Sequence, residues 1–239
     1  MGKSTELRVC KDLDELNATA AVLFLELSLE KTGEKGFFTA VLSGGKTPEA
    51  LYKLLATPQF KVKIPWEKVH LFWGDERCVG PDDPESNYGM AEKALISKVG
   101  IPAGNVHRIK GELSAPVAAS LYEDEIKAFF GKGEPVFDLV MLGLGDDGHT
   151  LSLFPATTAL VETKRLVAGN FVEKFGSWRV TMTLPLVNRA SNLVFMAAGA
   201  GKSAVVKEVF EGSDHPADRI RPINGRLVWL LDTEAAKLL

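Results

Sequence analysis

The sequence has few cysteines and almost no excess of either charge, and each shortage excludes a class of protein. Its two cysteines, Cys10 and Cys78, lie far apart without a C-x-x-C pair or suitably spaced histidines, so neither a disulfide framework nor a zinc site is expected. Reduced thiols are typical of a cytoplasmic protein. The 28 basic and 31 acidic residues nearly balance, which argues against nucleic acid or a membrane surface as a partner.

Long apolar runs are also absent. No segment is apolar over enough residues to span a bilayer, and residues 1–8 lack the apolar core of a signal peptide. No internal repeat or low-complexity tract occurs. Because 46% of the 239 residues are hydrophobic, the chain can bury one large core, and we expect a single domain over residues 1–239 located in the cytoplasm.

What the chain does contain is a regular alternation of short apolar runs with helical segments. Asp12 and Ser86 are predicted helix N-caps. The expected strands are 6–10, 37–42, 69–73, 106–109, a buried strand beginning at 137, 165–168, 178–184, 192–198 and 227–231, and the expected helices are 12–31, 49–56, 86–99, 114–130, 203–211 and 233–239. This alternation predicts an α/β fold, a three-layer α/β/α sandwich with a mainly parallel sheet.

Residues 137–155 are the most informative stretch, because an apolar run ends there in a glycine-rich turn. Its glycines at 143, 145 and 148 match the G-x-G-x-x-G dinucleotide fingerprint. Asp146 and Asp147 place negative charge where a pyrophosphate would bind, however, and Pro155 would cut the following helix short. We therefore expect no nucleotide cofactor and interpret His149 as a reactive side chain at the strand end, the alternative being an ordinary loop histidine. Gly145 and Gly148 are expected to clear space around His149.

Two further strands end in turns suited to an anion. Ser43, Gly44 and Gly45 follow the strand at 37–42 and precede a helix, so backbone N–H groups and the helix dipole can bind a phosphate there. The alternative is a tight connection that needs glycine for its backbone conformation. The segment around Lys202 imitates the end of a P-loop but has Met196 where the first glycine is required. It predicts a helix start with a lysine, suitable for a single phosphate.

The strand at 69–73 is also predicted to end in a loop of charged residues, at 74–77. Arg77, after Asp75 and Glu76, is a candidate for orienting an anionic or carbonyl oxygen, and an internal salt bridge with either acid is the alternative. Arg179, in an alternating segment, is predicted to face away from the core and adds a further cation. The acidic run at 123–125 lacks the partners that would complete a metal site, so no metal is expected.

These residues together predict general-base chemistry on a small phosphorylated metabolite. A neutral imidazole, with an ordinary pKa near 6.5, can take a proton from water without a metal. Asp147 can hold the His149 tautomer or stabilise the imidazolium, as the acid of a triad does. No G-x-S-x-G elbow positions a nucleophilic serine.

The same segments carry a resemblance to a known family. They are Ser43–Pro48, Gly74–Arg77 with Ser86–Met90, Gly143–Thr150 with Leu153–Pro155, Trp178–Arg179, Gly199–Lys202 and Pro222–Gly225. In this order they resemble the signature blocks of 6-phosphogluconolactonases, a family grouped with glucosamine-6-phosphate deaminases. The resemblance covers nearly the whole chain. It implies a Rossmann-like fold and hydrolysis of 6-phosphoglucono-1,5-lactone to 6-phosphogluconate in the oxidative pentose phosphate pathway.

Carried over residue by residue, the resemblance assigns roles to the candidates. It implies that His149 activates water with Asp147 beside it, and that Arg77 stabilises or positions the reacting end of the substrate. The implied phosphate ligands are Ser43, Gly44, Gly45, Arg179 and Lys202. No cofactor or partner other than the small-molecule substrate is implied, and the oligomeric state stays open, with a monomer compatible.

Two alternatives remain at this point. A deaminase of the same family usually has a glutamate shortly after the Asp-Gly-His turn, whereas residues 150–155 contain none. Asp75 keeps the analogous acid after the third strand, so this exclusion is incomplete. A non-catalytic sugar-phosphate sensor would be expected to lack the base and to carry a partner-binding extension, and His149 argues against it.

Overall fold

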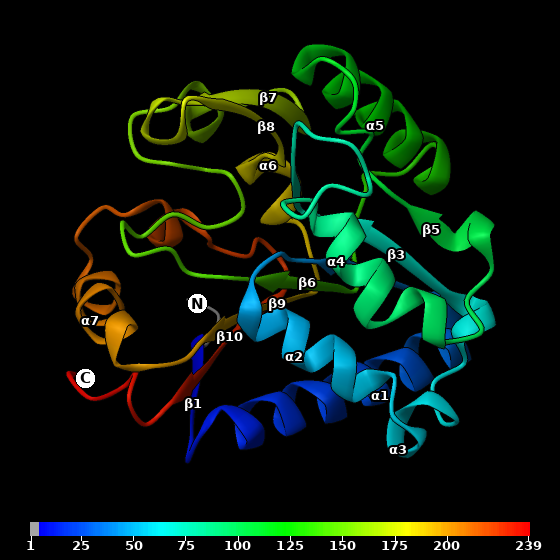
Figure 1. Cartoon of the computed structure of the whole chain (residues 1–239), viewed down its shortest axis with the longest axis horizontal. Helices are drawn as coiled ribbons and strands as arrows, with labels where there is room; N and C mark the ends of the chain where they lie inside the picture. Colours follow the sequence, from blue (N-terminus) through cyan, green and yellow to red (C-terminus); the bar gives the residue numbers. More distant parts are fainter. Residues whose placement is uncertain (1–4) are drawn as a thin grey trace.

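The computed structural model describes residues 5–239, and its centre is a seven-stranded sheet in which every neighbouring pair of strands is parallel (Figure 1). The strands lie in the order β1 (Thr5–Cys10), β10 (Arg226–Asp232), β9 (Asn192–Ala197), β6 (Leu139–Leu142), β2 (Phe38–Leu42), β3 (Val69–Trp73) and β5 (Val106–His107). The central strands β2, β6 and β9 are buried along their whole length. Covered faces explain why these runs are apolar without alternation.

Helices cover both faces of this sheet, as the predicted three-layer sandwich requires. They are α1 (Leu13–Lys35), α2 (Lys46–Leu55), α3 (Pro58–Lys61), α4 (Asn87–Ala94), α5 (Ala115–Phe130), α6 (Leu184–Val187) and α7 (Ser203–Glu211). Phe24 of α1 packs edge-on against Phe38 of β2, with ring centroids 5.2 Å apart. Phe129 of α5 packs against Phe72 of β3 at 5.3 Å, and the strand register directs Phe72 to the opposite face from Phe38. None of the helices within residues 5–239 is long and apolar enough to cross a membrane.

The strand order reverses between β2 and β6. From β2 the chain continues to β3 and β5 on one side, and from β6 it continues to β9 and β10 on the other. The buried carboxylate of Asp138 joins the two strands, because it accepts hydrogen bonds from the backbone N–H of Thr39 at 2.8 Å and from its hydroxyl at 2.9 Å. Open α/β sheets bind ligands at such a reversal, at the carboxyl ends of the strands.

A second, antiparallel sheet was not predicted. It consists of β4 (Asp75–Arg77), β8 (Ser177–Met182) and β7 (Val167–Val172). The prediction of a loop at 75–77 is therefore wrong: β3 continues through Gly74 directly into β4. Gly74 donates its N–H to Leu42 at 3.0 Å and accepts from Met182 at 2.8 Å, so it connects the two sheets. The β7–β8 hairpin ends in a 3₁₀ turn, Glu173–Phe175, which reaches back toward the edge where β2 and β6 end.

The local predictions have mixed outcomes. Asp12 and Ser86 are N-caps as expected, accepting from the N–H groups of Glu15 and Gly89. The helix capped by Ser86 ends earlier than predicted, at Ala94. The predicted helix at 233–239 is wrong, because its hydrogen bonds form only turns. No helix follows β6 directly either: residues 150–157 form tight turns in which Leu151 and Ala156 adopt positive φ angles of 54° and 58°.

His70 of β3 gives the fold a defined response to acid. Burial and the neighbouring His107 lower the pKa of His70 to about 4. In the unfolded chain the pKa of histidine is about 6.5. Between that pH and about 4, the unfolded state therefore binds a proton at His70 and the folded state does not. The contribution of neutral His70 to the free energy of unfolding is thus fully present above about pH 6.5 and is lost as the pH falls toward 4.

We predict that His70→Phe reduces the loss of unfolding free energy between pH 6.5 and 4.5, because the replacement cannot bind a proton. Urea unfolding at several pH values measures this slope, and the difference between the two proteins at pH 7.5 serves as the reference for packing effects. Equal slopes in both proteins would contradict the prediction.

Candidate active site

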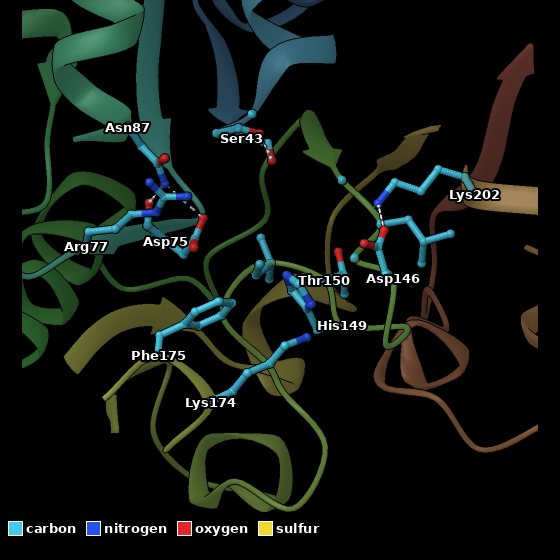
Figure 2. Close-up of a pocket in the computed structure, with 16 residues that line it drawn as sticks. Ser43, Asp75, Arg77, Asn87, Asp146, His149, Thr150, Lys174, Phe175 and Lys202 are labelled. Carbon is cyan, nitrogen blue, oxygen red and sulfur yellow. Dashed lines mark hydrogen bonds and ion pairs between the residues drawn. The ribbon is translucent and has the colours of Figure 1, made fainter. Parts of the chain in front are cut away.

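A cavity of about 480 Å³ lies at the carboxyl ends of β2 and β6 (Figure 2). It is lined by six of the eight residues to which the resemblance assigns roles, namely Ser43, Gly44, Gly45, Arg77, His149 and Lys202. Asp147 is not part of the lining but bonds His149 from behind. Arg179 is also outside the lining, on β8 directly opposite Arg77 of β4. The cavity thus collects groups from both sheets at the strand-order reversal.

His149 and Asp147 form a hydrogen-bonded pair. A carboxylate oxygen of Asp147 bonds the imidazole Nδ1, and no hydrogen bond within residues 5–239 involves the other ring nitrogen, Nε2. The imidazole stacks on Phe154 with ring centroids 4.0 Å apart. Burial opposes ionisation of Asp147, but hydrogen bonds from Lys174 and His149 outweigh it and lower the pKa of the carboxyl. An ionised Asp147 holds the proton on Nδ1, which leaves Nε2 as an acceptor.

Glycines provide the room for this imidazole, though not all of those expected. A Cβ on Gly145 would lie 1.9 Å from Nδ1 of His149, so only glycine is compatible with the observed ring position. Gly148, by contrast, has φ of 70°, and a Cβ there would lie 2.4 Å from the ring of His215. The prediction that Gly148 clears space around His149 is therefore wrong. It permits a left-handed turn and the approach of a different histidine.

The turn at Ser43 to Gly45 forms the start of α2. Gly45 is the N-cap with φ of 104° and makes no side-chain capping bond, so the first N–H groups of the helix lack a side-chain acceptor from it. Tyr52 holds the turn, because its hydroxyl accepts from the N–H of Ser43 at 2.9 Å and donates to its carbonyl at 2.8 Å. A Cβ on Gly44 would lie 2.0 Å from the Asn87 amide oxygen. This geometry suits an anion at the helix N-terminus.

Arg77 makes no ion pair within the part of the chain that the structure describes, although Asp75 and Glu76 are its neighbours. Its guanidinium donates to the carbonyl of Glu85 at 2.6 Å. Arg179 lies over the ring of Phe175, 5.7 Å from its centroid, and burial together with Arg77 lowers the pKa of Arg179. Two arginines that have no carboxylate partner among residues 5–239 give this edge of the cavity a positive charge.

Asp75 and Glu76 are occupied elsewhere. The Asp75 carboxylate accepts from the Ser152 hydroxyl at 2.6 Å and from the Asn87 amide at 3.3 Å. Glu76 accepts from the first N–H groups of α4, those of Asn87 and Tyr88, at 2.7 Å each. Burial raises the pKa of Glu76 despite these bonds. Glu76 therefore has a structural role at a helix N-terminus, whereas Asp75 and Asn87 also face the cavity.

Two lysines of the cavity are paired with adjacent acids of the central turn. Lys202 forms an ion pair with Asp146, and Lys174 forms one with Asp147 at 2.8 Å. Lys174 and Phe175 were not predicted from the sequence. They lie in the loop of a hairpin, and only a correct pairing of the strands at 165–168 and 178–184 would have directed that loop to the site.

The residues that the structure describes contain no group of three or more histidines, cysteines or acids placed to hold a metal ion. The cavity instead combines an imidazole with a free nitrogen, an open helix N-terminus and several cations. This combination can deprotonate a water molecule beside an anionic ligand. It makes the cavity a candidate site for general-base chemistry on an anionic ligand, built on an α/β/α scaffold.

Comparison with known proteins identifies the family. Residues 11–229 match the family described as glucosamine-6-phosphate isomerases/6-phosphogluconolactonase. The chain belongs to this family. It is 46% identical over 213 residues to the 6-phosphogluconolactonase of Synechocystis sp., with 85% of each chain covered.

Solved structures agree with this placement. A 6-phosphogluconolactonase from Trypanosoma cruzi superposes with a TM-score of 0.89 and 31% identity, over 100% of this chain and 98% of that chain. A monomeric glucosamine-6-phosphate deaminase superposes with a TM-score of 0.83 at 20% identity, over 98% of this chain and 100% of that chain, and this likeness shows the common fold alone.

We predict that Gly145→Ala displaces the imidazole of His149 and leaves the fold intact, because the ring can swing away from the new methyl group. The low-field proton NMR signal of the bonded Nδ1–H should disappear. Any activity that depends on this imidazole should fall by about 10²-fold. Gly104→Ala is the control, since a Cβ there meets nothing within 4 Å; retention of the Nδ1–H signal in both variants would contradict the prediction.

Proposed function

We propose that the chain hydrolyses 6-phospho-D-glucono-1,5-lactone to 6-phospho-D-gluconate, the lactonase step of the oxidative pentose phosphate pathway. The observation that carries this proposal is the His149–Asp147 hydrogen bond at Nδ1 in a cavity that also contains an open helix N-terminus. The names of the Synechocystis and Trypanosoma relatives support the substrate class.

In the proposed mechanism Nε2 of His149 takes a proton from water as the water oxygen attacks the lactone carbonyl. Asp147 stabilises the imidazolium that forms. The tetrahedral intermediate then collapses, the bond between C1 and the ring oxygen breaks, and the imidazolium returns its proton to that ring oxygen. The product is an open-chain hydroxy acid. No metal is needed in this scheme, because a neutral imidazole can itself take the proton from water.

The cations have separate roles in this proposal. Arg77, which has no carboxylate partner within residues 5–239, stabilises the oxyanion that develops at C1. The turn at Ser43 to Gly45 and Lys202 bind the 6-phosphate. Arg179 adds positive charge beside Arg77 and reaches the phosphate only by changing its orientation, since it lies against Phe175 and outside the cavity lining.

The deaminase alternative is less well supported. Deamination with isomerisation requires an acid that moves a proton between carbon atoms, and residues 150–155 supply no carboxylate. Asp75 lines the cavity, yet its carboxylate already accepts from Ser152 and Asn87. A non-catalytic sensor would have no use for an imidazole held in one tautomer.

We predict that His149→Ala lowers kcat for the lactone by about 10²- to 10⁴-fold, the usual contribution of a general base. The assay follows freshly generated 6-phosphogluconolactone, corrected for its spontaneous opening, with glucosamine 6-phosphate tested in parallel. Unchanged turnover in the variant would remove His149 from the mechanism. Rapid release of ammonia from glucosamine 6-phosphate would favour the deaminase instead.

We predict that Lys202→Ala acts mainly on KM. The loss of a charge-assisted hydrogen bond of about 1.5–3 kcal/mol corresponds to a rise in KM of roughly 10- to 150-fold. The increase should largely vanish with a lactone that lacks the 6-phosphate. An unchanged KM and kcat for the phosphorylated lactone would exclude Lys202 from the phosphate site.

A further inference from the structure

The tip of the β7–β8 hairpin touches the catalytic pair from a distant part of the chain. Lys174, in the 3₁₀ turn Glu173–Phe175, lines the cavity together with Phe175 (Figure 2). Its ammonium group donates to Oδ2 of Asp147 at 2.8 Å, while Oδ1 of the same carboxylate bonds Nδ1 of His149. One carboxylate thus bridges a lysine and the imidazole.

This bridge fixes the orientation of the carboxylate. A carboxylate bonded through one oxygen can rotate about its χ2 torsion, whereas a second bond from the opposite side restrains that rotation. Lys174 is exposed, and an exposed ion pair stabilises a fold only slightly. Its effect is therefore expected on the imidazole and not on overall stability.

We propose that Lys174 is a positioning residue for His149, acting through Asp147. It holds Oδ1 toward Nδ1, so that Nε2 stays directed at the attacking water. Its positive charge also disfavours protonation of the imidazole before water is bound. This inference rests on the proposed lactonase function for its kinetic readouts, and the geometric part stands on the hydrogen bonds alone.

Other charged groups also surround the His149–Asp147 pair. His149 and Asp147 share their turn with Asp146, which pairs with Lys202. The segment packed on Gly148 brings His215, bonded to Glu208. Across the cavity lie Asp75 and Arg77, and Arg179 stands beside Arg77. Among these cations, Lys174 alone bonds the carboxylate that bonds the imidazole.

Loss of this ammonium group has two expected consequences. The carboxylate gains freedom, so the imidazole samples other orientations and kcat falls by roughly 5- to 20-fold, less than the ~10²-fold that a displacement of 1 Å can cost. A nearby positive charge is also removed, so the imidazole accepts a proton more readily. The acid limb of the kcat profile then moves to higher pH by about half a unit, on the order of the interaction of unit charges ~6 Å apart in water.

The experiment compares Lys174→Met with Lys174→Arg, which keeps the charge and a donor for Asp147. Lys98→Met is the matched control at an exposed lysine outside the cavity. We expect Lys174→Met to lower kcat and shift its acid limb while KM stays within about twofold of the original. Lys174→Arg should restore most of the turnover and the original acid limb, and Lys98→Met should change neither.

Two outcomes would overturn the proposal. Lys174→Met with an unchanged kcat profile would show that the ion pair is incidental. A rise of KM alone, with the acid limb in place, would instead make Lys174 a ligand of the substrate phosphate.

A readout independent of turnover separates this inference from the proposed function. The imidazole signals of His149 are assigned by NMR through their absence in His149→Gln, and their titration is followed in the original chain and in Lys174→Met. A higher titration midpoint in Lys174→Met supports the positioning role even if lactonase activity is absent. An unchanged midpoint rejects it even if the lactone is hydrolysed.

Discussion

The site depends on one buried contact, in which Asp138, immediately before β6, accepts two hydrogen bonds from Thr39 of β2. These strands share only a short ladder, Ala40 to Leu139 and Val41 to Val140, so the added bonds help to keep them adjacent. Their adjacency brings the turn after β2 and the turn after β6 to the same place. The helix N-terminus at Gly45 and the imidazole of His149 then face one cavity.

At the cavity, two neighbouring aspartates pair with lysines from different parts of the chain. Asp146 pairs with Lys202 and Asp147 with Lys174, so the central turn neutralises two lysines that arrive from separate elements. The arginines of β4 and β8 have no such partner within residues 5–239. A negatively charged ligand is thus attracted most directly by Arg77 and Arg179 and by the N-terminus of α2. Asp146 and Asp147 instead hold the two lysines and the imidazole of His149 in place.

The sequence predicted what depends on local pattern. A few neighbouring residues are enough to indicate a strand end, an N-cap such as Asp12 or Ser86, or a turn such as those that contain Ser43 and His149. The small antiparallel sheet has none, because β4 consists of three charged residues, Asp75–Arg77, and its partners come about a hundred residues later. Lys174 and the contact between Gly148 and His215 were missed for the same reason. The prediction of a helix at 233–239 was wrong because helical composition alone does not supply the tertiary packing that a short helix needs.

The hydrogen bond from Ser152 to Asp75 joins residues 77 positions apart, and that from Thr39 to Asp138 joins residues 99 apart. Contacts this distant in the chain close large loops, so they form late and slowly when the protein folds. The cavity is assembled from such contacts and not from any contiguous segment. On the ribosome, a nascent chain whose β9 and α7 have not yet emerged therefore contains His149 and the turn at Ser43 to Gly45 without a complete cavity.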